Sequence, residues 1–410
     1  MNLARRLLQG FVRPYGAPWG LKWRFGPAAW MLRCCYAVDR FSKACRVLEV
    51  RFWRKPLIRF YYSRSDYAPA PCSVTLRLTS NCNLRCAQCG QWGDQGVFIQ
   101  PGGPASFKEM STEDWRRVIA GLAPVCGHIY FFGGEPFLRK DCLELVAYAA
   151  SRNVIAGVNT NGNFLKGNGH AIVDSGMDFL IVSLDGPRDI NNRIRRGRYD
   201  VYESVIDGVE ELVSARKHRN SRWPFIELNM TLTETNQPYI METAEVAARL
   251  GIDYFAVTLG IFTTPDLAKE SSDQFREEFG VEPHFYSGFV RDMSKMDPQL
   301  IDTQIRKVKR IWRSRYKQYP PIDCSFAEYF GQPAKPLVTS PCLVPWMTMQ
   351  LMPNGDMAYC EDFPDLVTGN VRQQHPLALW NNSASLAWRR RIRTKGIFRA
   401  ETRCCSYYLQ

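Results

Sequence analysis

Residues 73 to 89 read SVTLRLTSNCNLRCAQC, and this stretch decides the fold class. Its first seven residues alternate, with Val74, Leu76 and Leu78 on one face, which predicts a β-strand. The strand runs directly into a loop with the spacing C-x3-C-x2-C, formed by Cys82, Cys86 and Cys89. Three thiolates on one short loop can bind three irons of a cubane cluster and leave the fourth iron open to a small molecule. The alternative for this loop is a zinc site that lacks its fourth ligand, or a group of buried cysteines.

Strands and helices alternate from this stretch to about residue 262. The pattern predicts further strands over 128–132, 154–158, 179–184, 225–232 and 254–259. It predicts helices from Ser111 or Thr112 onward and over 141–152, 199–217 and 237–250. Such alternation is typical of a parallel sheet with right-handed crossovers, whose reactive groups lie at the carboxyl ends of the strands. The fold class is therefore α/β, a partial (β/α)6 barrel of the TIM type.

Four regions follow from the same reading. We expect residues 1–69 to form a basic, aromatic and helical extension and residues 70–262 to form the barrel. Residues 263–340 read as a mostly helical insertion or linker, and residues 341–410 as a small C-terminal domain with renewed cysteines.

The positive charge of the chain is concentrated at its N-terminus. The formal net charge is +13, and residues 1–66 carry 14 Lys and Arg against 3 acids, together with Trp19, Trp23, Trp30 and Trp53. Such an arm can pack its rings on the barrel, or lie on an anionic membrane surface, or contact nucleic acid, which is the least favoured of the three. No apolar run reaches the roughly 18 residues of a spanning helix, and the N-terminus does not read as a secretory signal. We expect a cytoplasmic protein, with peripheral contact at the inner face of the membrane as an open alternative.

The chain has 14 cysteines, and its length and missing export signal favour a reducing compartment over a disulfide framework. The triad and the segments after it resemble the radical SAM superfamily. The resemblance implies that Cys82, Cys86 and Cys89 bind a [4Fe-4S] cluster whose open iron binds S-adenosylmethionine (SAM). Reductive cleavage of SAM then gives a 5′-deoxyadenosyl radical that abstracts hydrogen from an unactivated carbon.

Three further segments match that superfamily in order. Gly133-Gly134-Glu135-Pro136, after the second strand, resembles its methionine-binding turn, where glycines let the backbone approach closely. Asn161, after the third strand, resembles its polar turn at that place. Ser183 and Asp185 resemble the segment that contacts the ribose and the methionyl part, although Asp185 could equally serve an Asx-type turn.

One residue departs from the superfamily pattern. Relatives usually carry an aromatic residue before the third cysteine, near the adenine, and this chain has Gln88. The adenine pocket is therefore expected to use hydrogen bonding there, or another ring such as Trp92.

The second cysteine set resembles the SPASM extension of radical SAM enzymes. Cys342 is followed after twelve residues by Gly355 and after four more by Cys360, and Cys404 and Cys405 lie downstream. These cysteines are too few for two clusters, so the resemblance implies a shortened, twitch-like domain with one auxiliary [4Fe-4S] cluster. Its implied ligands are Cys342, Cys360 and one or both of Cys404 and Cys405, with Cys324 as a further option. Such a cluster can relay an electron, hold substrate, or only fold the domain.

The resemblance thus implies a radical SAM enzyme acting on a peptide or a lipid-type substrate, with a reductant such as flavodoxin or ferredoxin. It does not identify a catalytic side chain. The alternatives are a non-catalytic iron–sulfur scaffold and a nucleic-acid-modifying radical enzyme.

Overall fold

The computed structural model describes residues 43, 54–99, 108–336, 341–360 and 362–404. The chain divides into two compact units, residues 1–56 and residues 57–410. Most of the first unit lies outside the described residues, and with it most of the basic arm expected over 1–69. The description below concerns the second unit.

Six parallel strands follow one another in chain order within one sheet. They are β1 (Ser73–Thr79), β2 (His128–Gly133), β3 (Ile155–Thr160), β4 (Phe179–Ser183), β5 (Phe225–Thr231) and β6 (Tyr254–Thr258). Each strand pairs with the next, so that all six carboxyl ends lie at one edge of the sheet. The predicted partial barrel is present, and the predicted strands differ from the observed ones by at most two residues at either end.

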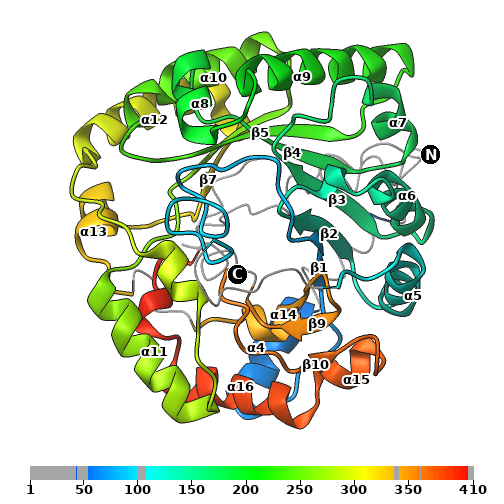
Figure 1. The fold of residues 1–410 in the computed structure, drawn as a ribbon, viewed down its shortest axis with the longest axis vertical. Helices are drawn as coiled ribbons and strands as arrows, with labels where there is room; N and C mark the ends of the chain where they lie inside the picture. Colours follow the sequence, from blue (N-terminus) through cyan, green and yellow to red (C-terminus); the bar gives the residue numbers. More distant parts are fainter. Residues whose placement is uncertain (1–42, 44–53, 100–107, 337–340, 361, 405–410) are drawn as a thin grey trace, which may run out of the picture. The chain divides into compact units, whose positions relative to one another are not determined.

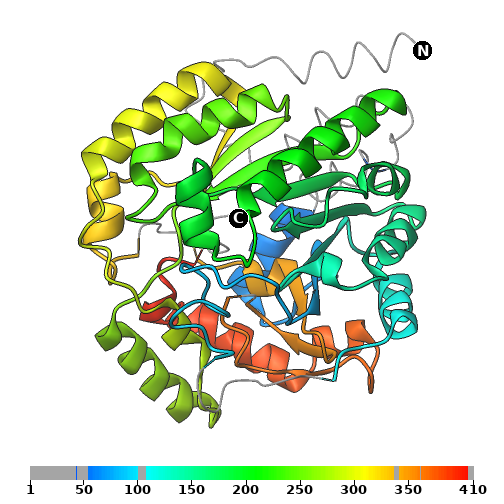
Figure 2. The ribbon, with the colours of Figure 1, turned by 45° about the horizontal axis from the view of Figure 1, so that its top comes forward.

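Helices cover the outside of this curved sheet (Figures 1 and 2). Val74, Leu76 and Leu78 are fully buried or nearly so, as the strand pattern of β1 predicts, while Thr75, Arg77 and Thr79 alternate with them and point to the opposite face. The helices between the strands are α5 (Thr112–Leu122), α6 (Cys142–Ser151), α7 (Gly169–Asp174), α8 (Arg188–Arg195), α9 (Val201–His218) and α10 (Ile240–Arg249).

Local signals in the sequence set the ends of several helices. Ser111 caps α5 in a capping box with Asp114, and Asp200 caps α9 by accepting from the backbone N–H of Glu203. The helix expected over 237–250 begins as a short 3₁₀ turn, Gln237–Tyr239, and continues as α10.

The sheet continues beyond the six strands at both ends. After β6 come α11 (Pro265–Phe279), α12 (Pro298–Trp312) and β7 (Tyr316–Tyr319), which pairs parallel to β6, and then α13 (Phe326–Gly331). The region expected to be mostly helical thus also contains a strand that the sequence pattern did not predict. α12 ends where the chain leaves helical geometry at Arg313, whose φ is 50°.

The C-terminal residues join the other end of the same sheet. β8 (Thr348–Leu351) pairs parallel to β1, and β9 (Asp356–Ala358) and β10 (Gly369–Asn370) follow antiparallel. The turn between β8 and β9 is Pro353-Asn354-Gly355, with Gly355 at a φ of 91°. α14 (Val344–Met347), α15 (Pro376–Trp380) and α16 (Ser383–Lys395) complete this part.

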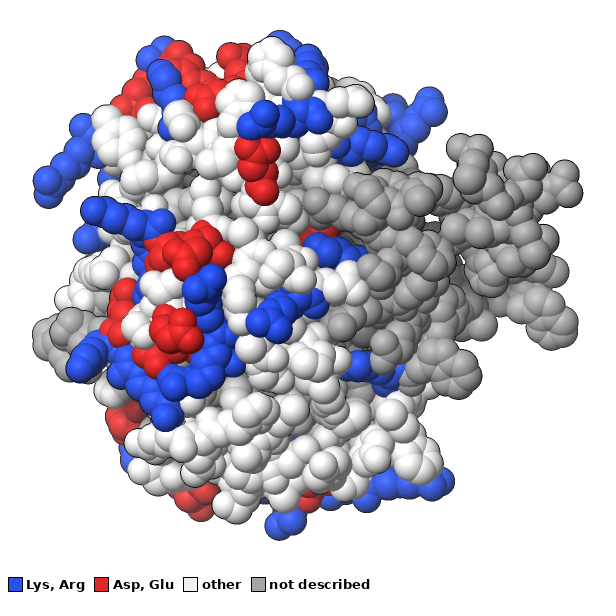
Figure 3. All heavy atoms as spheres, turned by 90° about the vertical axis from the view of Figure 1, so that its right-hand side faces the viewer, with Lys and Arg blue, Asp and Glu red and all other residues white. Residues whose placement is uncertain are grey.

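Charged side chains of both signs are interleaved on the face drawn in Figure 3, with no single-sign field among the coloured residues. None of the helices in the described part of the chain is both long and apolar enough to cross a membrane.

Candidate functional site

The cysteine loop leaves the carboxyl end of β1 and crosses the middle of the ring of helices in Figure 1. It folds on itself through short backbone hydrogen bonds, from Cys89 N to the carbonyl of Cys86 (3.0 Å) and from Gly93 N to that of Cys89 (3.0 Å). A Cβ on Gly93 would lie 2.5 Å from the Cys89 carbonyl oxygen, so only glycine fits there. Ala87 N donates to the carbonyl of Ile194 (2.9 Å), which ties the loop to the end of α8.

The three thiols share one electrostatic environment. Burial raises the pKa of the Cys82 thiol to about 11 and that of Cys86 to about 12, and the charges of the triad influence one another. Backbone N–H groups approach the sulfurs, from Leu84 to Cys82 (3.5 Å) and from Gln91 and Trp92 to Cys89 (3.4 Å each). Buried thiols of this kind are neutral unless a cation stabilises the thiolates, and bound iron supplies that charge. The donor set therefore fits the expected cluster.

Two arginines near the triad were not predicted from the sequence. Arg195, on α8, is 8% exposed and interacts electrostatically with Cys86 and Cys82. Arg291 is half-buried, interacts electrostatically with Cys89, and donates through Nη2 to the carbonyl of Gln88. The charge of Arg195 acts against burial and lowers the pKa of the Cys86 and Cys82 thiols. No local sequence signal connects the two arginines to the triad, because they lie more than 100 residues downstream.

The Gly-Gly turn after β2 packs directly on the start of the cysteine loop. Gly134 N donates to the carbonyl of Thr79 (2.8 Å), and Glu135 N donates to that of Asn81 (2.9 Å). A Cβ on Gly133 would lie 2.5 Å from the Thr79 carbonyl oxygen, and one on Gly134 would lie 2.1 Å from that of Asn81. Any side chain at either position would therefore push the two segments apart.

The buried carboxylate of Glu135 connects this turn to the end of β3. It accepts from Phe137 N (3.0 Å), Thr160 Oγ1 (2.9 Å) and Asn161 N (2.7 Å). Asn161 Nδ2 in turn donates to Asn83 Oδ1 (2.8 Å), inside the cysteine loop, and lies 4.0 Å from Cys82 Sγ. The carboxyl ends of three strands are thus held together around Cys82.

Asp185 is completely buried and lies at the centre of a second network. Its Oδ1 accepts from Thr231 N (2.8 Å), while its Oδ2 accepts from Gln88 Nε2 (2.6 Å) and lies 2.7 Å from Arg195 Nε. Its backbone N–H donates to Asn191 Oδ1 (2.9 Å), one helical turn before Arg195 on the same face of α8. Gln88, which departs from the superfamily pattern, is therefore a hydrogen-bonding partner of the expected ribose-side residue.

Several buried polar atoms around the cysteine loop have no hydrogen-bond partner among the described residues. They include Gln88 Oε1, Ser80 Oγ and Asn159 Oδ1. Ser183, at the end of β4, is half-buried and pairs in register with Asn229 on β5. Unsatisfied buried polar atoms are costly, so their presence at the strand ends suits a polar ligand such as SAM.

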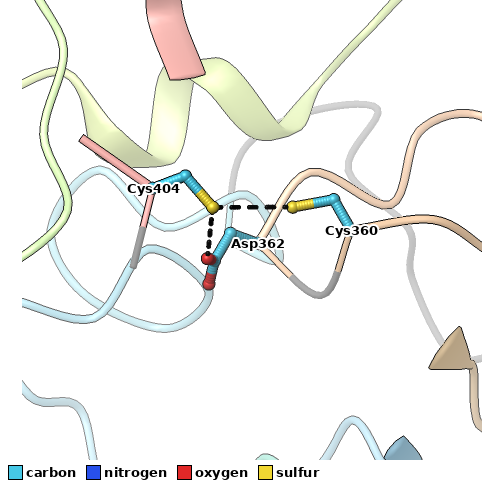
Figure 4. A group of neighbouring side chains, drawn as sticks. All are labelled: Cys360, Asp362 and Cys404. Carbon is cyan, nitrogen blue, oxygen red and sulfur yellow. Dashed lines mark hydrogen bonds between the residues drawn. The ribbon is translucent and has the colours of Figure 1, made fainter. Parts of the chain in front are cut away.

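A second group lies where the loop after β9 meets the segment before Cys404 (Figure 4). Cys360 Sγ and Cys404 Sγ are 3.9 Å apart, and Asp362 Oδ2 is 3.3 Å from Cys404 Sγ. Of the expected auxiliary ligands, the structure brings Cys360 and Cys404 together. Cys342 and Cys324 do not belong to this group of ligand atoms, and Cys405 lies outside the described residues. Asp362 was not predicted, because a lone acidic residue gives no local signal of metal binding.

Two family models match parts of the chain. Residues 76–224 match the Radical SAM superfamily, and residues 342–406 match SPASM, an iron-sulfur cluster-binding domain. An AdoMet-dependent heme synthase of Oleidesulfovibrio alaskensis is 25% identical over 346 residues, which cover 84% of this chain and 82% of that protein. A PqqA peptide cyclase of Bradyrhizobium diazoefficiens is 23% identical over 349 residues, covering 82% of this chain and 79% of that protein.

Other relatives match over less of their length, with 32% of one and 43% of another covered. Among solved structures, Streptococcus suis SuiB bound to the precursor peptide SuiA superposes with a TM-score of 0.56 at 12% identity, covering 93% of this chain and 76% of that one. At this identity the likeness shows the fold.

Proposed function

Because this chain belongs to the radical SAM superfamily and carries a SPASM domain, we propose that it cleaves SAM reductively and abstracts hydrogen from a carbon of a peptide substrate. Its cofactors are SAM, the [4Fe-4S] cluster of the superfamily and an auxiliary iron–sulfur centre. The chain is accordingly an enzyme. The observation that carries the proposal is the half-buried cysteine triad after β1, which lies beside the turns that follow three further strands.

We assign the cluster to Cys82, Cys86 and Cys89, and the methionyl part of SAM to the turn from Gly133 to Pro136. When bound, the cluster supplies the electron that breaks a carbon–sulfur bond of SAM. The Gly133 and Gly134 backbone can approach a ligand closely because it carries no Cβ. Glu135 and Asn161 hold this turn against the cysteine loop.

We assign the ribose side to Ser183 and Asp185. In the described structure the Asp185 carboxylate already binds Arg195, Gln88 and Thr231, so its first task is to position Gln88. The unpartnered Gln88 Oε1 is then available to a donor group of the ligand. Ser183 offers a hydroxyl from the neighbouring strand.

The peptide substrate is supported by the relative named PqqA peptide cyclase, which aligns over most of both chains. A tetrapyrrole is a second candidate, because a relative of similar coverage is named AdoMet-dependent heme synthase. Contact with a membrane or a lipid-type substrate depended on the basic arm over residues 1–66 and stays a prediction, as do the reductant and the expected region boundaries.

Isotope transfer tests the proposal. The anaerobically reconstituted, dithionite-reduced full chain is incubated with SAM and a perdeuterated mixture of short cellular peptides, and 5′-deoxyadenosine is analysed by mass spectrometry. Deuterium in 5′-deoxyadenosine is the expected result, since the radical takes its hydrogen from substrate carbon. If 5′-deoxyadenosine forms without deuterium, but forms faster with an added iron porphyrin, the peptide assignment is wrong and the tetrapyrrole is favoured.

A further inference from the structure

The group around Cys360 and Cys404 contains a carboxylate, that of Asp362, in addition to its two thiols. The ligand atoms of Cys360, Asp362 and Cys404 all lie within 4.8 Å of one another. In Figure 4 the three side chains converge from two segments that are 42 residues apart, with Asp362 and Cys360 on one side and Cys404 on the other. This convergence is the starting observation.

The position of Cys404 is fixed by its neighbour in the chain. The Arg403 guanidinium is fully buried and donates to the carbonyls of Tyr329 (2.9 Å), Lys335 (2.9 Å) and Gln332 (2.6 Å). Cys404 N also donates to the carbonyl of Glu401 (3.0 Å). Because these bonds hold the backbone up to and including Cys404, its thiol is part of a built site.

The loop that carries Asp362 is held just as firmly. Phe363 is 7% exposed, and its ring centroid lies 5.1 Å from that of Tyr286 and 5.2 Å from that of Phe289. Asp365, three residues after Asp362, accepts from the backbone N–H groups of His284 and Phe285. With these anchors in place, the carboxylate of Asp362 is directed at Cys404.

All three residues fall inside the matched iron-sulfur cluster-binding domain. The chain is also short of thiols, because only Cys404 and Cys405 follow Cys360.

We propose that Asp362 is a ligand of the auxiliary iron–sulfur centre, beside Cys360 and Cys404. One iron of that centre is then bound through a carboxylate oxygen. The inference depends on the auxiliary centre of the SPASM domain and not on SAM cleavage, so each can fail without the other.

The test uses the full chain with Cys82, Cys86 and Cys89 replaced by Ala, so that every iron signal comes from the auxiliary centre. Iron and acid-labile sulfide per chain are measured after anaerobic reconstitution. EPR spectra are recorded on the oxidised protein, in which a three-iron cluster gives its signal, and on the reduced protein, in which a four-iron cluster does. Asp362→Ala should lose iron or give the signal of a three-iron cluster, because a cubane iron without its protein ligand dissociates easily. Asp362→Cys should retain iron with altered g-values, since a thiolate replaces an oxygen donor.

Asp365→Asn is the matched control, because it removes a negative charge from the same loop while its amide oxygen can still accept the anchoring hydrogen bond from His284 N. It should leave iron content and spectrum unchanged. Unchanged iron content and EPR spectra in Asp362→Ala would overturn the proposal. It would also be overturned if the parent protein with the three Ala replacements bound no iron, or bound zinc without sulfide. If Asp362→Ala does not fold, unchanged g-values in Asp362→Cys refute it instead.

Discussion

The ion pair between Arg195 and Asp185 gives the most quantitative prediction about the site. Arg195 is 8% exposed and Asp185 is 0% exposed, with Nε and Oδ2 2.7 Å apart. Removing one partner of such a buried pair costs about 3–5 kcal/mol, because the remaining charge stays buried. Arg195→Met keeps the volume and apolar stem of the side chain and removes its charge. We therefore expect the free energy of unfolding to fall by about 3–5 kcal/mol.

Urea unfolding of the anaerobic, reconstituted protein, followed by tryptophan fluorescence, measures this change. With a denaturant slope of about 3 kcal/mol per molar, the midpoint should fall by about 1–2 M. Arg188→Met is the matched control, because Arg188 begins the same helix and pairs with Asp200 at the surface, with 57% of its side chain exposed. Equal midpoints for the two variants would refute the assigned role of the buried pair, as would a midpoint for Arg195→Met equal to that of the wild type.

Three further predictions concern the barrel and the adenine side. Burial raises the pKa of Glu227 to about 7 from 4.5, so the folded chain keeps a proton that the unfolded chain releases, and stability should fall by about 3 kcal/mol between pH 4.5 and 7. In Glu227→Gln this part of the pH dependence should be missing when urea midpoints are measured between pH 4.5 and 7. If the midpoints of the variant and the wild type change equally with pH, Glu227 is not the group responsible. A Cβ on Gly157 would lie 2.0 Å from the Phe179 ring. Gly157→Ala should therefore lower the free energy of unfolding in urea by about 1–3 kcal/mol, and by less in a Phe179→Leu background. An equal loss in the two backgrounds would exclude the clash. Gln88→Leu removes a 2.6 Å hydrogen bond to Asp185, worth about 1.5–3 kcal/mol, and should weaken SAM binding in equilibrium dialysis; unchanged affinity would exclude Gln88 from the SAM pocket.

The six strands of the barrel could be predicted from the sequence because each one is a local pattern. Alternating or continuous apolar residues bounded by turn signals decide a strand within seven residues or fewer. The same holds for the start of α5, where Ser111 and Asp114 form a capping box three residues apart.

β7 could not be predicted from a local sequence pattern. Its four residues, Tyr316 to Tyr319, follow a basic helix after a short 3₁₀ turn and carry no strand pattern of their own. Pairing with β6 makes them a strand, and this pairing is a long-range contact that overrides local propensity.

The partners of the site residues could not be predicted either, because they too depend on long-range contacts. The spacing of the three cysteines is visible on one short loop, but the position of Arg195 beside them depends on how α8 packs. Asp362 is one acid among 40 acidic residues, and only the fold places it against Cys404. Gln88 could be recognised as a departure from the superfamily pattern, whereas its hydrogen bond to Asp185 could not.

The central claim is that Cys82, Cys86 and Cys89 bind the cluster that cleaves SAM. Its most direct test is the formation of 5′-deoxyadenosine from SAM by the anaerobically reconstituted, dithionite-reduced protein, measured beside the Cys86→Ala variant. The account predicts 5′-deoxyadenosine with the wild-type chain and none above background with the variant. Absence of the product from the wild-type protein with its iron–sulfur clusters bound, or equal rates for the two proteins, would contradict it.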